Sequence, residues 1–176
     1  MNNLIEILRS RLEERGTAFM VDRETGALVL PFHIAGQQME VTITESGEDC
    51  GIITRFPLIV PARRLKPTAE LCCRFNERLT IGAFVVSFEG RTLSHQLWYP
   101  IKGDECGIWE CVEMFDRSMP GIRTTVSDAV EPFLKVAHTG LTPAHVFVQF
   151  ARRIDGETRK DRIAAELLDT ESIHLN

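Results

Sequence analysis

The stretch that decides the fold is LVLPFHIAGQQMEVTIT, Leu28 to Thr44. Its apolar residues alternate with other residues on both sides of Ala35-Gly36, which reads as a turn. A period of two is that of a β-strand with one buried face. The pattern therefore predicts two adjacent strands. The alternating apolar residues are Leu28, Leu30, Phe32 and Ile34, then Met39, Val41 and Ile43.

Further strands lie on both sides of this stretch. Ala18 to Val21 precedes it across the turn signal DRETG, and Gly51 to Leu58 follows it. A second hairpin is predicted from Ile81 to Phe88 and from Arg91 to Tyr99, around Glu89-Gly90. Strands grouped into meanders, rather than alternating with helices, predict an antiparallel sheet with helices packed on one side. This is an α+β fold with a sheet of about six strands.

Apolar residues at helical spacing predict the helices that cover this sheet. A first helix runs to about Arg15, where Gly16 supplies a residue that commonly ends helices. A second follows Pro61 and spans residues 65–79. Residues 108–115 and 122–133 predict two more, separated at Pro120-Gly121 because proline is disfavoured inside a helix.

The end of the chain reads as an addition to this fold. Thr139-Gly140 resembles a joint, which divides the chain into an α+β domain at 1–139 and a C-terminal helical extension at 140–176. Thr142-Pro143 has the form of a helix start, and a second helix is predicted at 158–168. The helix at 144–154 carries an apolar face, so we expect it to dock on its own domain or on a second copy of the chain. The residues of that face are Val146, Phe147, Phe150 and Ile154.

Composition excludes several classes of function. The chain has 176 residues and a formal net charge of −5 that is spread along it, which argues against nucleic-acid binding, since phosphate neutralisation needs clustered Lys and Arg. The N-terminal residues show no continuous apolar run, so neither a secretion signal nor a membrane span is expected. The five cysteines, an odd number, favour reduced thiols and a cytoplasmic protein without membrane partners.

Three segments resemble one known family: FPLIVP at Phe56 to Pro61, CCRFNERLTIGAF at Cys72 to Phe84, and LWYPIKG after it. They are similar to the YbjN-like family, bacterial proteins described as sensory transduction regulators. Asn76, Gly82 and Phe84 match the family pattern, whereas Cys73 stands where many members carry a second asparagine.

The resemblance runs from Val21 to about Ile122. It implies a fold shared with type III secretion chaperones, a role in protein interaction and no chemistry. Chaperones of that fold commonly work as homodimers, and the edge strands of a small sheet need covering, so we expect self-association.

Two pentapeptides, GEDCG at 47–51 and GDECG at 103–107, raise the question of a metal or thiol site. A metal would need Cys50 and Cys106 to converge with two further ligands. Because the two cysteines belong to different connections, we expect them to be far apart and metal-free. Turns and helix starts explain glycine and acidic residues in such places.

Nucleophilic catalysis would need a thiol or hydroxyl beside a base. Ser94 and His95 are neighbours in a predicted strand, so their side chains should point to opposite faces. Cys72 lies on the apolar stripe of its helix and is expected in the core, with Cys73 more exposed. We therefore predict no catalytic residue, no cofactor and no metal.

The aromatic residues give the one positive indication of function. Trp98 and Tyr99 adjoin in a strand, and Trp109 lies off the apolar stripe of its helix. Trp98 and Trp109 are therefore the candidate interaction surface, since exposed indoles often anchor interfaces. The alternative is that helices or the C-terminal residues cover both. The sequence favours a non-enzymatic protein-binding module, chaperone-like or regulatory, with an unidentified protein partner. The alternative class is a hydrolase or thiol-dependent enzyme on the same scaffold.

Overall fold

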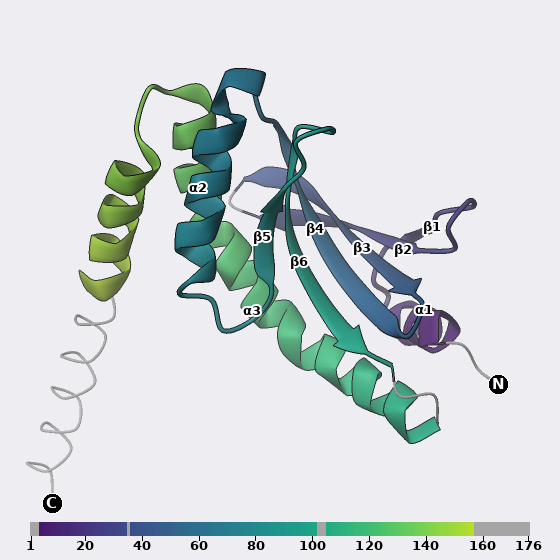
Figure 1. Ribbon diagram of the computed structural model, residues 1–176. Helices are drawn as coiled ribbons and strands as arrows, with labels where there is room; N and C mark the ends of the chain where they lie inside the picture. Colours follow the sequence, from purple (N-terminus) through teal and green to yellow (C-terminus); the bar gives the residue numbers. More distant parts are fainter. Residues whose placement is uncertain (1–3, 35, 102–104, 157–176) are drawn as a thin grey trace, which may run out of the picture.

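The structure is a computed structural model, and it describes residues 4–34, 36–101 and 105–156. Within them six strands form one antiparallel sheet in the order β1-β2-β3-β4-β6-β5, and helices lie against one of its faces (Figure 1). The predicted α+β class is confirmed. The strands are β1 (Met20–Val21), β2 (Leu28–Ile34), β3 (Gln37–Ser46), β4 (Asp49–Ile59), β5 (Ala83–Val86) and β6 (Thr92–Pro100); the helices are α1 (Leu4–Glu14), α2 (Leu65–Asn76), α3 (Glu105–His138) and residues 143–156.

The two strands predicted within Leu28 to Thr44 are β2 and β3. Its register runs from Leu28↔Ile43 to Ile34↔Gln37, so the alternating apolar residues of both strands face the helices. The same alternation continues through β4 and β6, where Ile52 pairs with Leu97. Period-two burial across four neighbouring strands gives the sheet one covered and one uncovered face.

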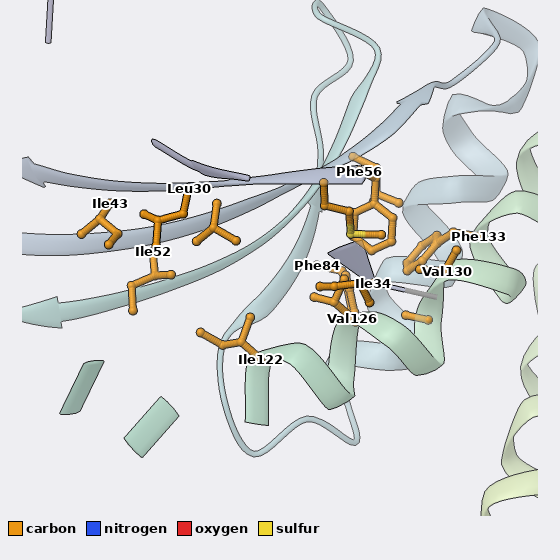
Figure 2. Packing of buried hydrophobic residues seen from close by; sticks show 14 of the residues in the cluster. Leu30, Ile34, Ile43, Ile52, Phe56, Phe84, Ile122, Val126, Val130 and Phe133 are labelled. Carbon is orange, nitrogen blue, oxygen red and sulfur yellow. The ribbon is translucent and has the colours of Figure 1, made fainter. Parts of the chain in front are cut away.

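The core is centred on aromatic rings from three elements. Phe56 of β4, Phe84 of β5 and Phe133 of α3 pack together with ring centroids 5.0–6.0 Å apart (Figure 2). Figure 2 also shows Val126 and Val130 of α3 beside them. Burying each such side chain contributes about 1.5–3 kcal/mol, before entropy is subtracted, so these contacts fix the position of α3 on the sheet.

The prediction of two helices around Pro120 is wrong, because α3 continues through it as one helix. Pro120 is exposed on the solvent side, while Phe115, Ile122 and Val126 continue one buried stripe across it. An interior proline costs about 3 kcal/mol. Burial of Ile122 and Val126 returns about 1.5–3 kcal/mol each, so a straight continuation is the more stable choice.

The first helix forms as predicted, and Gly16 follows it with φ of 63°. Its three leucines are buried, and Arg11 together with Arg15, which follows the helix, is paired with Asp116 of α3. Arg15 donates to both carboxylate oxygens of Asp116, at 2.7 and 2.9 Å, and Arg11 lies 2.7 Å from the second. Partial burial opposes ionisation of Asp116, but these two guanidinium groups lower its pKa below the ordinary value.

The first predicted strand is shorter than expected. It was predicted at Ala18 to Val21, but only Met20 and Val21 pair with β2, at Val29 and Leu28. Continuing this ladder would set Ala18 against Pro31, which has no backbone N–H to donate. A proline on an edge strand ends pairing in this way.

The helix at 143–156 docks on its own domain, which confirms that its apolar face is buried. The rings of Phe147 and Phe150 lie 5.5 and 4.6 Å from that of Phe75 in α2, and Val146 is 2% exposed. Arg153 adds an ion pair to Glu131 of α3. The predicted helix at 158–168 lies outside the described residues, and the division of the chain at 139/140 stays a prediction. No helix in the described ranges combines the length and apolar composition needed to cross a membrane.

Candidate functional site

One face of the sheet has no helix over it in the part of the chain that the structure describes (Figure 1). We call it the outer face. Uncharged cross-strand pairs such as Thr42↔Ile53 and Ile53↔Gln96 lie on it. Glu40 and Arg55 form an ion pair there, 3.4 Å apart. The outer face comprises Val29, Pro31, Glu40, Thr42, Thr44, Gly51, Ile53, Arg55, Pro57, Ile59, Val85, Ser94, Gln96 and Trp98.

Trp98 lies flat on this face. It pairs with Gly51 of β4, and a Cβ on Gly51 would come within 2.5–2.8 Å of three atoms of the indole ring. Only glycine leaves room for the ring there. Trp98 is nevertheless 42% exposed, while its neighbour Tyr99 is buried against the helices. The prediction that these adjacent side chains face opposite sides is confirmed.

Trp109 belongs to a different surface. It is 48% exposed on α3, a helix that lies on the covered side of the sheet. Both indoles are thus exposed among the described residues, as predicted. The structure does not bring them onto one face, and an interaction role for either stays a prediction.

The outer face opens where β3 and β4 part. Their pairing runs from Ser46↔Asp49 to Glu40↔Arg55 and stops there. Beyond that point β3 continues with β2 to Gln37, whereas β4 continues with β6 and resumes at Ile59↔Thr92 after an irregularity. Figure 1 shows the start of β3 and the end of β4 diverging. The sheet is forked at this point.

A hollow of about 500 Å³ occupies the fork. Residues of both faces line it, which is possible because the strands have separated. Met39 and Phe56, 3% and 7% exposed, belong to the core, while the others belong to the outer face or its rim. Its volume is in the range of ligand sites. We call it the fork hollow; its lining is Met20, Val29, Pro31, Gln38, Met39, Glu40, Arg55, Phe56 and Pro57.

The ion pair of the fork hollow has unused hydrogen-bonding capacity. Oε1 of Glu40 accepts from Arg55 and from the Thr42 hydroxyl, each at 3.4 Å. The side chains of Arg55 and Glu40 are 59% and 48% exposed. A guanidinium carries five N–H donors and a carboxylate has a second oxygen, so a bound group can reach both charges.

The thiols described here are poorly suited to catalysis. Burial raises the pKa of both Cys50 and Cys72 to about 12, so each is protonated at neutral pH. A protonated, buried thiol is a weak nucleophile. Cys72 is in the core and Cys73 is exposed, which confirms the predicted orientation of that helix.

His95 and Thr54 face each other in the core. They are register partners on β6 and β4, and both are fully buried. His95 Nε2 lies 3.1 Å from the Ile81 carbonyl oxygen, whereas His95 Nδ1 and Thr54 Oγ1 have no hydrogen-bond partner among the described atoms. Burial lowers the pKa of His95, although the bond to Ile81 opposes this. Ser94 faces the outer side, so the prediction that Ser94 and His95 point to opposite faces is confirmed.

The two pentapeptides are not remote from each other. The first forms the β3–β4 turn, and Ile101, just before the second, donates its backbone N–H to the Glu48 carbonyl. The reasoning that different connections must lie far apart is therefore wrong. The Cys106 side chain lies outside the described part, so the separation from Cys50 stays a prediction. The described residues contain no group of three His, Cys, Asp or Glu that could hold a metal.

Both sheet edges are protected within the chain. The side-chain amide of Asn76 donates to the Phe84 carbonyl at 3.0 Å and accepts from the Phe84 N–H at 2.7 Å. An α2 side chain thus takes the place of a neighbouring strand along β5. At the opposite edge β1 and Pro31 limit pairing with β2. Such devices prevent edge-to-edge association.

Sequence reasoning missed the fork hollow. One signal was present: Pro57 lies inside a stretch read as an interior strand, where proline is found at bulges. The bulge lies in the pairing of β4 with β6, whereas the residues that line the hollow opposite it come from β1, β2 and β3, and only the tertiary structure brings them together.

The comparisons with known proteins agree with this architecture. The YbjN family model, described as "Putative bacterial sensory transduction regulator", matches residues 4–102, from α1 to the end of β6. The chain belongs to the YbjN family. The match begins before the resemblance seen in the sequence and ends before most of α3. A search of the curated proteins found no match.

Among solved structures, a similar fold is that of YbjN from E. coli, titled "a putative transcription regulator". The two share 14% sequence identity with a TM-score of 0.55, over 73% of this chain and 91% of that one. At this identity the likeness shows the fold. It supports the expected architecture of this YbjN family member.

Proposed function

We propose that this YbjN family protein is a non-enzymatic regulator that acts by binding another protein through its outer face. The observation that carries the proposal is Trp98, a large indole held flat on Gly51, on the sheet face that no described helix covers. Tryptophan is enriched among residues that dominate binding energy, and a preordered ring loses little entropy when a partner covers it.

The distribution of titratable groups favours binding over catalysis. The fork hollow contains one carboxylate and one guanidinium, which pair with each other. Cys50, Cys72 and His95 are buried, and burial holds the two thiols and the imidazole in their neutral forms. A hydrolase or thiol enzyme would need such groups together in a cleft. These observations support a binding module over the alternative enzyme.

Self-association and a cytoplasmic location are further parts of the proposal. The original reason for a homodimer, uncovered strand edges, is weakened because Asn76 and Pro31 protect the edges. The exposed apolar side chains of the outer face, Ile59, Val85 and Trp98, support self-association instead. The described cysteines are free thiols, which is typical of a reducing compartment.

Site-specific photo-crosslinking in the producing cells tests the proposal. A photoreactive phenylalanine at Gln96, beside Trp98 on the outer face, should give a discrete protein adduct. The photoreactive phenylalanine in place of Arg117, which is exposed on α3, is the matched control and should give no adduct. A Trp98→Ala change should reduce the Gln96 adduct severalfold. An adduct of twice the chain mass identifies a second copy. Equal labelling from both positions, or no adduct from Gln96, contradicts the proposal.

A further inference from the structure

The fork hollow offers an unusual route to the core. In a continuous sheet, a ligand on one face cannot reach side chains of the other, because successive residues point to opposite sides. Here β3 and β4 have parted beyond Glu40↔Arg55, and Met39 and Phe56 of the core line the same hollow as Pro31 and Pro57. An apolar group entering the fork therefore meets apolar side chains on its floor and its walls.

Addition of a partner strand at the sheet edges is obstructed. At β5 the outward N–H and C=O of Phe84 are both bound by Asn76, so a new strand would have to displace that side chain. At β2 the pairing position after Val29 is Pro31, which has no N–H. An extended segment thus meets fewer obstacles at the fork than at either edge.

The electrostatics of the hollow select for an uncharged group. Glu40 and Arg55 neutralise each other at the centre of the lining. An anion would draw Arg55 away and leave the carboxylate unpaired, and a cation would do the reverse. The N–H and C=O of one residue in an extended chain point to the same side and satisfy both at once, because the carbonyl accepts from the guanidinium while the N–H donates to the free carboxylate oxygen.

We propose that the fork hollow binds an extended, uncharged peptide segment of a partner protein. One apolar side chain of the segment inserts towards Met39 and Phe56. The backbone C=O and N–H of one neighbouring residue bind Arg55 and Glu40, respectively. The inference rests on the proposed function as a protein-binding regulator and names the kind of segment that is recognised.

The test uses three short peptides with blocked ends and the full-length protein labelled with ¹⁵N. Acetyl-Gly-Leu-Gly-amide is the probe, and the same peptide with Glu or Lys in place of Leu is the charge control. We expect saturable shifts from the leucine peptide, confined to backbone amides of residues 29–30, 38–42, 55–56 and 58. The charged peptides should bind at least about fivefold more weakly, because neither fits an apolar floor beside a neutral ion pair.

A pair of variants locates the interaction. Arg55→Met keeps an apolar stem and removes the donors, so it should weaken leucine-peptide binding about tenfold, the loss of one charge-assisted hydrogen bond. Arg123→Met, an exposed arginine of α3, is the matched control and should leave binding unchanged.

Shifts scattered over the surface, equal binding of the three peptides, or no effect of Arg55→Met would each overturn the inference. These outcomes are separable from failure of the proposed function. If the Gln96 crosslink forms while the peptide does not bind the fork, the partner docks on the outer face without using the hollow, and only the present inference is wrong.

Discussion

Replacing Asn76 with alanine should cost more stability than its surface position suggests. The side chain makes two hydrogen bonds with one residue of β5, at 2.7 Å from the Phe84 N–H and 3.0 Å to the Phe84 carbonyl. Alanine removes both and leaves the edge of β5 without a partner. The Phe84 side chain is 2% exposed, so this strand also holds a ring at the centre of the aromatic core.

The magnitude follows from the number of bonds lost. Each hydrogen bond contributes about 1 kcal/mol net, and incomplete hydration of the Phe84 backbone adds to this. We expect Asn76→Ala to lower the free energy of unfolding by about 2–3 kcal/mol. For a chain of this size that corresponds to a fall in Tm of roughly 4–12 °C. Asn76→Asp, which keeps the acceptor but loses the donor, should be at least as destabilising.

Urea denaturation followed by circular dichroism measures the change, with Gln37→Ala as the control. Gln37 is an exposed amide on β3, so its removal should change stability by less than about 0.5 kcal/mol. A second readout is light scattering, since an uncovered β5 edge should promote association of Asn76→Ala at high concentration. A loss below about 0.5 kcal/mol for Asn76→Ala would refute the role of this amide as an edge cap.

Three further predictions concern pH, the C-terminal helix and the thiols. His95 has a pKa in the folded protein below its ordinary value of about 6.5. As the pH falls, His95 is therefore protonated in the unfolded chain at a higher pH than in the folded protein. The contribution of His95 to the free energy of unfolding should be complete above about pH 7, should fall as the pH drops below about 6.5, and should level off below the folded pKa. His95→Gln should lose this pH-dependent contribution. A free energy of unfolding that does not change from pH 7.5 to 5 would contradict the prediction. A chain ending at Gly140 should show a lower Tm and an unchanged oligomeric state in light scattering, because the helix at 143–156 docks on its own domain. An unchanged Tm would mean that the contacts of this helix do not stabilise the fold. Alkylation of the native protein, followed by peptide mass spectrometry, should label Cys73 and spare Cys50 and Cys72, and labelling of all three before unfolding would show that the buried thiols are accessible.

Local pattern was sufficient for most elements of the fold. The alternation in Leu28 to Thr44 predicted β2 and β3, because a strand with one buried face has an apolar residue at every second position, and this pattern is visible in the sequence. It also placed Trp98 and Tyr99 on opposite faces. The resemblance to the YbjN family came from short segments and was confirmed over residues 4–102.

Where local and tertiary preferences compete, the sequence was a poorer guide. Pro120 is a helix breaker by its own chemistry, yet α3 passes through it because the residues on both sides bury one continuous stripe on the sheet. The free energy of that burial cannot be read from a local window. The meeting of the β3–β4 turn with Ile101 escaped prediction for the same reason, since it depends on the pairing of β4 with β6.

The sequence by itself determined the α+β class, the strands and helices with a strong period, and the opposite orientation of Trp98 and Tyr99, since each depends on residues close together in the chain. Only the tertiary structure decided the fork hollow, the two hydrogen bonds of Asn76 with the Phe84 backbone and the docking of the helix at 143–156 on Phe75. These features join residues from separate elements. Their geometry is set by how strands pair and part, and pairing is a property of the folded chain rather than of any one segment.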